Sequence, residues 1–291
     1  MKRILVYVTS SLLTFHFGIT ADALLGGYLH PAENVPPPAE VVAIPQPTRE
    51  VEATPSPEPE IVFGGGRLTL APDEVHLSSD RLHYQINVRY PQVDGSDDPH
   101  IRRLNQRITE LMTKQYEWPI HIADEELRKA LRTHPEVYNQ VDIDYDVTAA
   151  TDSILSIYFL EYCYGIGAAH SVQGSLVVNY DLVAKKELKL SDLFKPGSGY
   201  LEFLSRYCKE EFKQQGQFLF PEALAPARGT FASWNVTPNG IRFNFDACAL
   251  SGCADGEREV EIPYSDLKPM LSARAMSILP ISSVVKVKAD H

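Results

Sequence analysis

Residues 141–164 decide the fold and read VDIDYDVTAATDSILSIYFLEYCY. In the first half, carboxylates alternate with apolar residues: Val141, Ile143, Tyr145 and Val147 are interleaved with Asp142, Asp144 and Asp146. An alternation of period two places the apolar side chains on one face of a β-strand and the polar ones on the other. The second half continues with β-branched and aromatic residues, which favour a second strand. We therefore expect two strands, the first with a buried face opposite a row of aspartates.

Toward the N-terminus, RLHYQINVRYP (81–91) shows the same alternation, and a helical pattern follows it. The apolar residues of that pattern recur every three or four positions, at Ile101, Leu104, Ile108, Leu111 and Met112. This spacing lines one face of an α-helix. Asp97, Asp98 and Pro99 stand directly before it and suit a helix start. A strand followed by an amphipathic helix is therefore expected.

Toward the C-terminus, further strands and helices follow in turn. SVQGSLVVNYDL (171–182) predicts a strand, and YLEFLSRYCKEEFKQQ (200–215) predicts an amphipathic helix. FASWNVTPNGIRFNFD (231–246) predicts a hairpin that turns at Pro238, Asn239 and Gly240, ahead of a strand at 258–264 and a short closing helix. The expected fold class is α+β, with antiparallel sheets and inserted amphipathic helices.

The N-terminus predicts export. Lys2 and Arg3 precede a mostly apolar stretch, so we expect residues 1–29 to be a signal anchor or signal peptide that places the remainder outside the cytoplasm. Ala21, Asp22 and Ala23 form a small-x-small site, and cleavage after Ala23 would give a secreted protein. Residues 30–66 are rich in proline and predict a semi-rigid linker. The expected folded parts are residues 67–150 and 151–280, with a loose tail at 281–291.

Composition excludes one class of partner. The chain has 27 Lys and Arg against 38 Asp and Glu, a formal charge of −11. Such a surface repels phosphate backbones, so nucleic acid is not an expected partner. A cationic partner and a solvated acidic surface without a partner are both compatible with the charge.

The four cysteines form an even set beyond the apolar segment, where thiols usually oxidise. Cys248 and Cys253 are spaced for a local loop disulfide, which would leave Cys163 to pair with Cys208. Zinc binding is the alternative, but it usually needs closely spaced ligand couples. We expect two disulfides, no metal site and no cofactor.

Candidate site residues come from two places in the chain. Asp142, Asp144 and Asp146 resemble the opening of a calcium loop, but Val147 and Ser153 stand where that loop needs Gly and Glu. We expect them instead to form an acidic strand face that contacts a ligand. Tyr164 and His170 complete the expected contact set.

His170, with Ser171 and Glu161 nearby in sequence, could be a general base, although a structural histidine is the alternative. No nucleophile elbow, H-E-x-x-H helix or phosphate-binding loop occurs, so an enzyme is not expected. The triplet Asn235, Val236 and Thr237 spells a glycosylation acceptor, which would matter only in a host that glycosylates secreted chains.

Several short segments, in a fixed order along the chain, carry a family resemblance. They are residues 90–93, Ile101, Leu104, Asn105, Ile108, Tyr164, residues 167–170, residues 179–182, Leu188, Leu190, residues 192–194, Gly240, Ile241, Phe243, Phe245, Gly256, Glu259, Val260, residues 262–264, Leu267 and Lys268. Together they resemble a bacterial extracytoplasmic domain pair of unknown function. It is found in the ectodomain of the lysozyme-sensing anti-sigma-V factor RsiV and in the N-terminal region of the peptidoglycan deacetylase PdaC.

The resemblance implies an α+β fold and a binding role at the cell envelope. Its implied ligand is a cationic protein such as lysozyme, or a cell-wall glycan. A cell-wall-modifying hydrolase with His170 in its site and a structural envelope protein are the alternatives. Because only three residues precede the apolar segment and no deacetylase domain follows residue 271, neither anti-sigma activity nor deacetylation is expected of this sequence.

Overall fold

The computed structural model describes residues 61–117, 137–168, 170–217, 219–220 and 222–281, with isolated positions between 119 and 132. These residues belong to one compact unit. The expected N-terminal segment, most of the linker and residues 282–291 of the tail lie outside the described residues. Among the helices of the described part, none is both long and apolar enough to cross a membrane.

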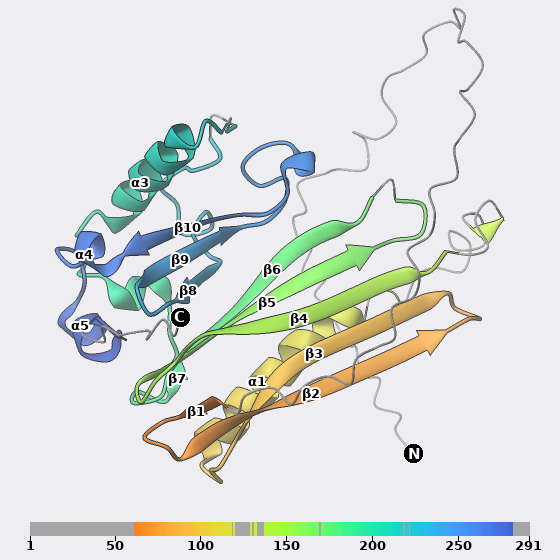
Figure 1. The fold of residues 1–291 in the computed structure, drawn as a ribbon, viewed down its shortest axis with the longest axis horizontal. Coiled ribbons are helices and arrows are strands. Elements are labelled where there is room, and N and C mark those ends of the chain that lie inside the picture. Colours follow the sequence, from red (N-terminus) through yellow and green to blue (C-terminus); the bar gives the residue numbers. More distant parts are fainter. Residues whose placement is uncertain are drawn as a thin grey trace, which may run out of the picture. The chain divides into compact units, whose positions relative to one another are not determined.

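The first sheet has seven strands in chain order and one helix against it (Figure 1). The strands are β1 (Ile61–Phe63), β2 (Leu68–Ser79), β3 (Tyr84–Asp94), β4 (Asn139–Ala150), β5 (Ile154–Tyr164), β6 (Val172–Asp181) and β7 (Lys186–Glu187). Neighbouring strands are antiparallel except β3 and β4, which are parallel. The sheet is thus mainly antiparallel, as expected, and β3 and β4 are the exception because the helix between them returns the chain to the same end of the sheet.

That helix, α1 (Pro99–Tyr116), forms where the apolar spacing predicts it. Asp98 is its N-cap and accepts a hydrogen bond from the backbone N–H of His100, which satisfies one of the free donors of the first turn. The buried side chains on α1 are Ile101, Leu104, Ile108 and Met112. They pack against the apolar face of the sheet, including Val141 and Ile143, and this contact forms the first core.

A second sheet and its helices enclose a second core. Its strands are β8 (Trp234–Val236), β9 (Gly240–Phe245) and β10 (Arg258–Pro263), in the order β10-β9-β8, and the turn at 237–239 joins β8 to β9 as expected. The helical segments are η3 (Leu190–Leu193), α3 (Tyr200–Gln214), η4 (Cys253–Asp255), α4 (Tyr264–Leu267) and α5 (Ala273–Ile278). The α+β class is confirmed.

A buried polar network joins the two sheets. Asn235 on β8 is fully buried and donates from Nδ2 to Oγ of Ser156 (3.2 Å) and to the Ile157 carbonyl oxygen (3.0 Å) on β5. Its Oδ1 accepts from Asn244 on β9 at 3.0 Å, and Ser156 donates to Asn179 on β6 at 2.6 Å. The glycosylation acceptor read from the sequence is therefore an interior residue, and a folded chain has no room for a glycan there.

The connection between β4 and β5 bears on the expected domain limits. The turn between Ala150 and Ile154 joins β4 to β5 inside the first sheet, so a division at residues 150 and 151 does not coincide with the limit between the two cores. Residues 61–63, expected to belong to the linker, form strand β1 instead.

The cysteines follow the expectation only in part. Cys248 and Cys253 form a disulfide with a Cα–Cα distance of 4.1 Å. No disulfide joins Cys163 to Cys208, so the expected pairing between them is wrong. Cys208 is buried on α3 in the second core, whereas Cys163 lies on β5 at the edge of the first, and each is held by its own core.

Candidate functional site

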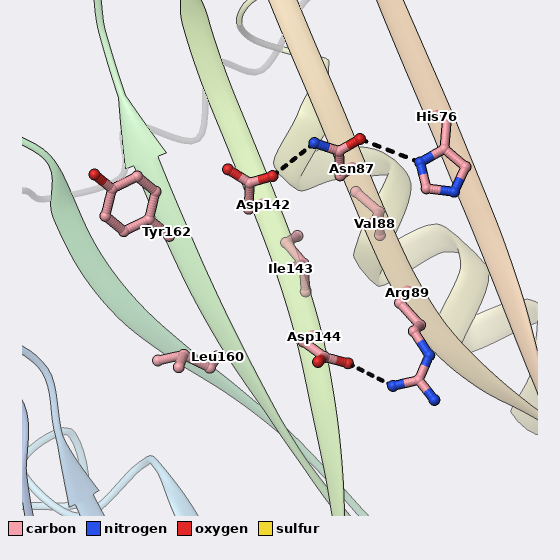
Figure 2. Close-up of a pocket in the computed structure, with 9 residues that line it drawn as sticks. All are labelled: His76, Asn87, Val88, Arg89, Asp142, Ile143, Asp144, Leu160 and Tyr162. Atoms are coloured by element: carbon pink, nitrogen blue, oxygen red, sulfur yellow. Dashed lines mark hydrogen bonds and ion pairs between the residues drawn. The ribbon is translucent and has the colours of Figure 1, made fainter. Parts of the chain in front are cut away.

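The face of the first sheet that lies away from α1 carries the polar residues of four adjacent strands (Figure 2). We call this surface the outer face and define it by Glu74, His76, Asn87, Arg89, Asp142, Asp144, Leu160 and Tyr162. The register aligns these residues in rows across the strands: His76 is opposite Asn87, Asn87 is beside Asp142, and Asp142 is opposite Tyr162. Strand alternation, which buries Val88 and Ile143 toward α1, turns these polar side chains outward.

The first row is a chain of hydrogen bonds that ends on two carboxylates. Nδ2 of Asn87 donates to Asp142 at 2.8 Å, so Oδ1 of Asn87 faces Nδ1 of His76 at 3.1 Å as an acceptor. The other ring nitrogen of His76 lies 3.3 Å from the Glu74 carboxylate. Since both neighbours of the ring are acceptors, the hydrogen bond to Asn87 and then that to Glu74 raise the pKa of His76 above its ordinary value.

The second row is built around Arg89. NH1 of Arg89 donates to Asp144 at 2.9 Å, and Nε lies 3.8 Å from Glu74. The guanidinium carbon lies 5.0 Å from the centre of the Tyr145 ring, a cation–π distance. Because the side chain of Asp144 is 67% exposed, this ion pair stays accessible to solvent and to ligands.

Leu160 and Tyr162 on β5 complete the outer face on the side away from β2. Both are exposed although their side chains are large and carbon-rich. With the two polar rows they line a hollow of about 370 Å³ on the sheet surface. The hollow thus combines an apolar wall with amide, imidazole, guanidinium and carboxylate groups, all of which can hydrogen-bond.

Asp146, the third expected aspartate, belongs to a neighbouring cluster at the junction with the second sheet. Its carboxylate lies 3.7 Å from NH2 of Arg242 on β9. The Arg242 guanidinium also lies 3.6 Å from Glu259 and 5.2 Å from the centre of the Tyr158 ring. No local pattern predicts this cluster, since Arg242 lies almost a hundred residues beyond Asp146 and only the packing of the two sheets brings them together.

Of the remaining predicted residues, Tyr164 lies at the end of the face that carries the aspartates, and His170 lies in a loop. Tyr164 is half-buried at the end of β5, opposite Gln140 and two residues beyond Tyr162 on the same face. His170 is exposed in the loop after β5, where Nδ1 lies 2.8 Å from the carbonyl oxygen of Ser171. Among the described residues, no carboxylate or nucleophilic side chain is hydrogen-bonded to this ring, so the structure gives His170 no catalytic partner.

The three aspartates are strand residues with nearby partners, not members of a calcium loop. No group of three or more His, Cys, Asp or Glu side chains is placed to hold a metal ion in the described part of the chain. Asn87, Arg89 and Arg242 each lie beside one of these carboxylates, so each of the three aspartates already has a hydrogen-bond or ion-pair partner in its own chain. A ligand must therefore compete with these internal contacts.

Comparison with known proteins gives two matches in succession along the chain. Residues 77–173 match the family model described as deacetylase PdaC, and residues 191–265 match the protein family of unknown function DUF3298. The peptidoglycan-N-acetylmuramic acid deacetylase PdaC of Bacillus subtilis is 26% identical over 172 residues. That match spans 57% of this chain and 37% of the relative's length.

Two solved structures of DUF3298 proteins resemble the chain. One from Bacteroides fragilis has a TM-score of 0.54 and 16% identity, covering 71% of this chain and 95% of that one. One from Pseudomonas aeruginosa has a TM-score of 0.47 and 15% identity, covering 71% and 96%. The first likeness supports the fold. The chain is thus similar to PdaC over most of its first sheet and to DUF3298 over much of the part that encloses its second core, which confirms the resemblance to extracytoplasmic domains of this class.

Proposed function

We propose that the chain is a binding domain of the bacterial cell envelope and that its outer face holds a segment of cell-wall glycan. The observation that carries this proposal is the exposed Tyr162 ring beside the Asn87–Asp142 pair. A sugar ring presents an apolar C–H face and several hydroxyls, which suit an exposed aromatic side chain next to planar hydrogen-bonding groups. The chain would work outside the cytoplasm. An uncleaved N-terminal segment would hold it at the membrane, whereas cleavage of that segment would release it.

The similarity to PdaC supports this assignment. The matched residues 77–173 contain the whole of β3, β4 and β5, which supply all but two of the outer-face residues. The relative's name states that it acts on peptidoglycan N-acetylmuramic acid. The segment shared by the two chains is therefore a reasonable place for recognition of the same polymer.

A cationic protein of the lysozyme type is a second candidate ligand. The formal charge of −11 and the exposed side chains of Asp144 (67%) and Asp146 (66%) favour it. Against it, both carboxylates already lie beside arginines of the same chain, so a protein cation would have to displace Arg89 or Arg242. Charge pairing at exposed sites is weak and sensitive to salt.

One titration distinguishes these ligands. The full chain, purified in mild detergent with its disulfide intact, is titrated with soluble peptidoglycan fragments and with hen-type lysozyme at low and physiological salt. Glycan recognition through the outer face predicts binding that changes little with salt and weakens about tenfold or more in Tyr162→Ala. Lysozyme binding through the aspartates predicts loss at physiological salt and in Asp144→Asn.

The control is Phe220→Ala, which removes an exposed aromatic ring outside the outer face. Equal losses in both aromatic variants, or no binding of either ligand by the wild-type chain, would contradict the proposal. The same samples test the hydrolase alternative: release of acetate or sugar that is abolished in His170→Ala would show a wall-modifying enzyme.

A further inference from the structure

Strand β2 is the outermost long strand of the first sheet, and most of its free side has no partner strand in the described part of the chain (Figure 1). β1 pairs only with residues 68–70, whereas β2 continues to Ser79. Exposed edges of this length are templates for pairing with another strand. Residues 71–79, which we call the open edge, therefore offer a surface for a further strand.

The direction of the backbone groups follows from two prolines. Pro72 on β2 is opposite Pro91 on β3, and neither has an N–H to donate. This pair must occupy a position where the backbone groups point away from the partner strand. Backbone groups alternate in direction along a strand, so every second residue after Pro72 has the same orientation. The N–H and C=O groups of Glu74, His76 and Ser78 therefore point outward along the open edge.

We propose that the occupant of the open edge is a second copy of this chain, paired antiparallel through β2 about a two-fold axis at Val75. In this register Glu74 of one copy is opposite His76 of the other, and the reciprocal pair repeats the contact. Each pair joins residues whose backbone groups point outward. The Glu74 N–H now donates to Oδ1 of Asp73 at 3.0 Å, so pairing exchanges this acceptor for the His76 carbonyl oxygen of the other copy.

The side chains of Glu74 and His76 favour this register over the others in which two open edges could pair. Glu74 and His76 lie on the outer face, and the two-fold places a carboxylate beside an imidazole of the partner at two symmetric positions. On the opposite face, Val75 meets its own copy at the axis, with Leu77, 40% exposed, beside it. A register centred on His76 would instead set two imidazoles against each other.

Other groups around His76 are compatible with the contact. Asn87 and Arg89 face it from β3, Asp142 and Asp144 lie beyond on β4, and Glu74 adjoins it on its own strand. The partner's Glu74 would thus add a carboxylate on the side of His76 that faces solvent. The paired sheets would place the two outer faces side by side, which goes beyond the binding role proposed above.

Site-directed crosslinking of the full chain tests the register. Paired residues at a position without mutual hydrogen bonds have Cα atoms about 4.5 Å apart, within disulfide range. Val75→Cys should therefore give a covalent dimer under mild oxidation. Leu77→Cys alone should crosslink at least tenfold less, because the two copies of residue 77 would be about 13 Å apart. Val183→Cys, at an exposed valine away from β2, and the parent chain with its native cysteines are the controls.

A second measurement does not depend on introduced cysteines. The wild-type chain should be dimeric by sedimentation at tens of micromolar, and Glu74→Lys should weaken dimerisation about tenfold or more by placing two like charges in contact. Glu74→Lys combined with His76→Glu reverses the pair and should restore the dimer. A monomeric wild-type chain, or equal crosslinking at residues 75, 77 and 183, would overturn the proposal. Since glycan affinity is measured separately, either proposal can fail without the other.

Discussion

The hydroxyl of Tyr158 on β5 donates to Oε1 of Glu257, 2.5 Å away, across the junction between the two sheets. Burial, ahead of any neighbouring charge, raises the pKa of both groups. The hydrogen bond favours the ionised carboxylate and partly offsets this effect at Glu257. The two sheets are therefore joined by a hydrogen bond in which the half-buried Glu257 carboxylate accepts from Tyr158, and this bond stabilises the ionised form of the carboxylate.

Removing that donor should destabilise the fold. We expect Tyr158→Phe to lower the free energy of unfolding at neutral pH by about 1–2 kcal/mol, because a half-buried carboxylate loses its hydrogen bond. Urea denaturation followed by circular dichroism measures the change. Tyr162→Phe, on the exposed part of the same strand, is the matched control and should change stability little. Equal effects of the two variants would argue against a stabilising role for the pair.

Glu161 predicts a pH dependence. Burial raises its pKa above the ordinary value of 4.5, the charge of Asp246 adds to the rise, and the Cys163 thiol opposes it by donating to the carboxylate. Between the ordinary and the raised pKa, the folded chain binds more protons than the unfolded chain. The contribution of Glu161 to stability therefore falls as pH rises through this window.

Replacing Glu161 with glutamine should remove that dependence. We expect Glu161→Gln to gain stability relative to the wild-type chain as pH rises from 5 to 8, as measured by urea denaturation at each pH. Glu259→Gln, at an exposed side chain, is the control. If the wild-type and Glu161→Gln stability curves run parallel across this range, the partly buried carboxylate of Glu161 does not titrate as inferred.

The network around Asn235 should be essential for the junction of the sheets. Asn235→Ala leaves buried partners on Ser156 and Asn244 without their hydrogen bonds, and we expect it to cost about 2–4 kcal/mol of unfolding free energy. Asn239→Ala changes the same residue type in the exposed turn four positions later, where the hydrogen bonds of Asn239 with other described residues are made by its backbone N–H and carbonyl oxygen. Thermal denaturation should show a large shift for the first variant and a small one for the second.

The loop disulfide should stabilise the second core. Replacing Cys248 and Cys253 together with serine frees a short loop, and we expect a loss of about 2 kcal/mol on the loop-entropy model. Dithiothreitol should destabilise the wild-type chain by a similar amount and leave the double variant unchanged. Sensitivity of the double variant to reductant would mean that Cys163 and Cys208 form a further disulfide.

Local patterns predicted the elements well. The spacing from Ile101 to Met112 gave α1 with Asp98 at its cap, and the Pro238 turn gave the β8–β9 hairpin, because both depend on residues close in sequence. The alternation around Asp142 likewise indicated which face of β4 is exposed. Such features follow from period and turn chemistry alone.

These local patterns do not predict contacts between residues that are far apart in the sequence. The parallel pairing of β3 with β4, the burial of Asn235 and the separate locations of Cys163 and Cys208 all depend on how distant segments dock. The same holds for the candidate site, where the aspartates were predicted but Asn87, Arg89 and Arg242 were not identified as their neighbours. An exposed polar residue on a strand does not reveal which strand lies beside it.

The parallel pair β3–β4 has a consequence for how the chain folds. The hairpins β2–β3 and β4–β5 close through short turns, but Tyr84 pairs with Asn139, which lies on the far side of α1 in the sequence. Contacts over such separations carry a larger loop-closure entropy and form late. We therefore expect the backbone amides of β2–β3 to be protected from hydrogen exchange before those between β3 and β4. In a chain exported N-terminus first, as proposed above, the first sheet would be completed only after the β4–β5 hairpin had crossed the membrane.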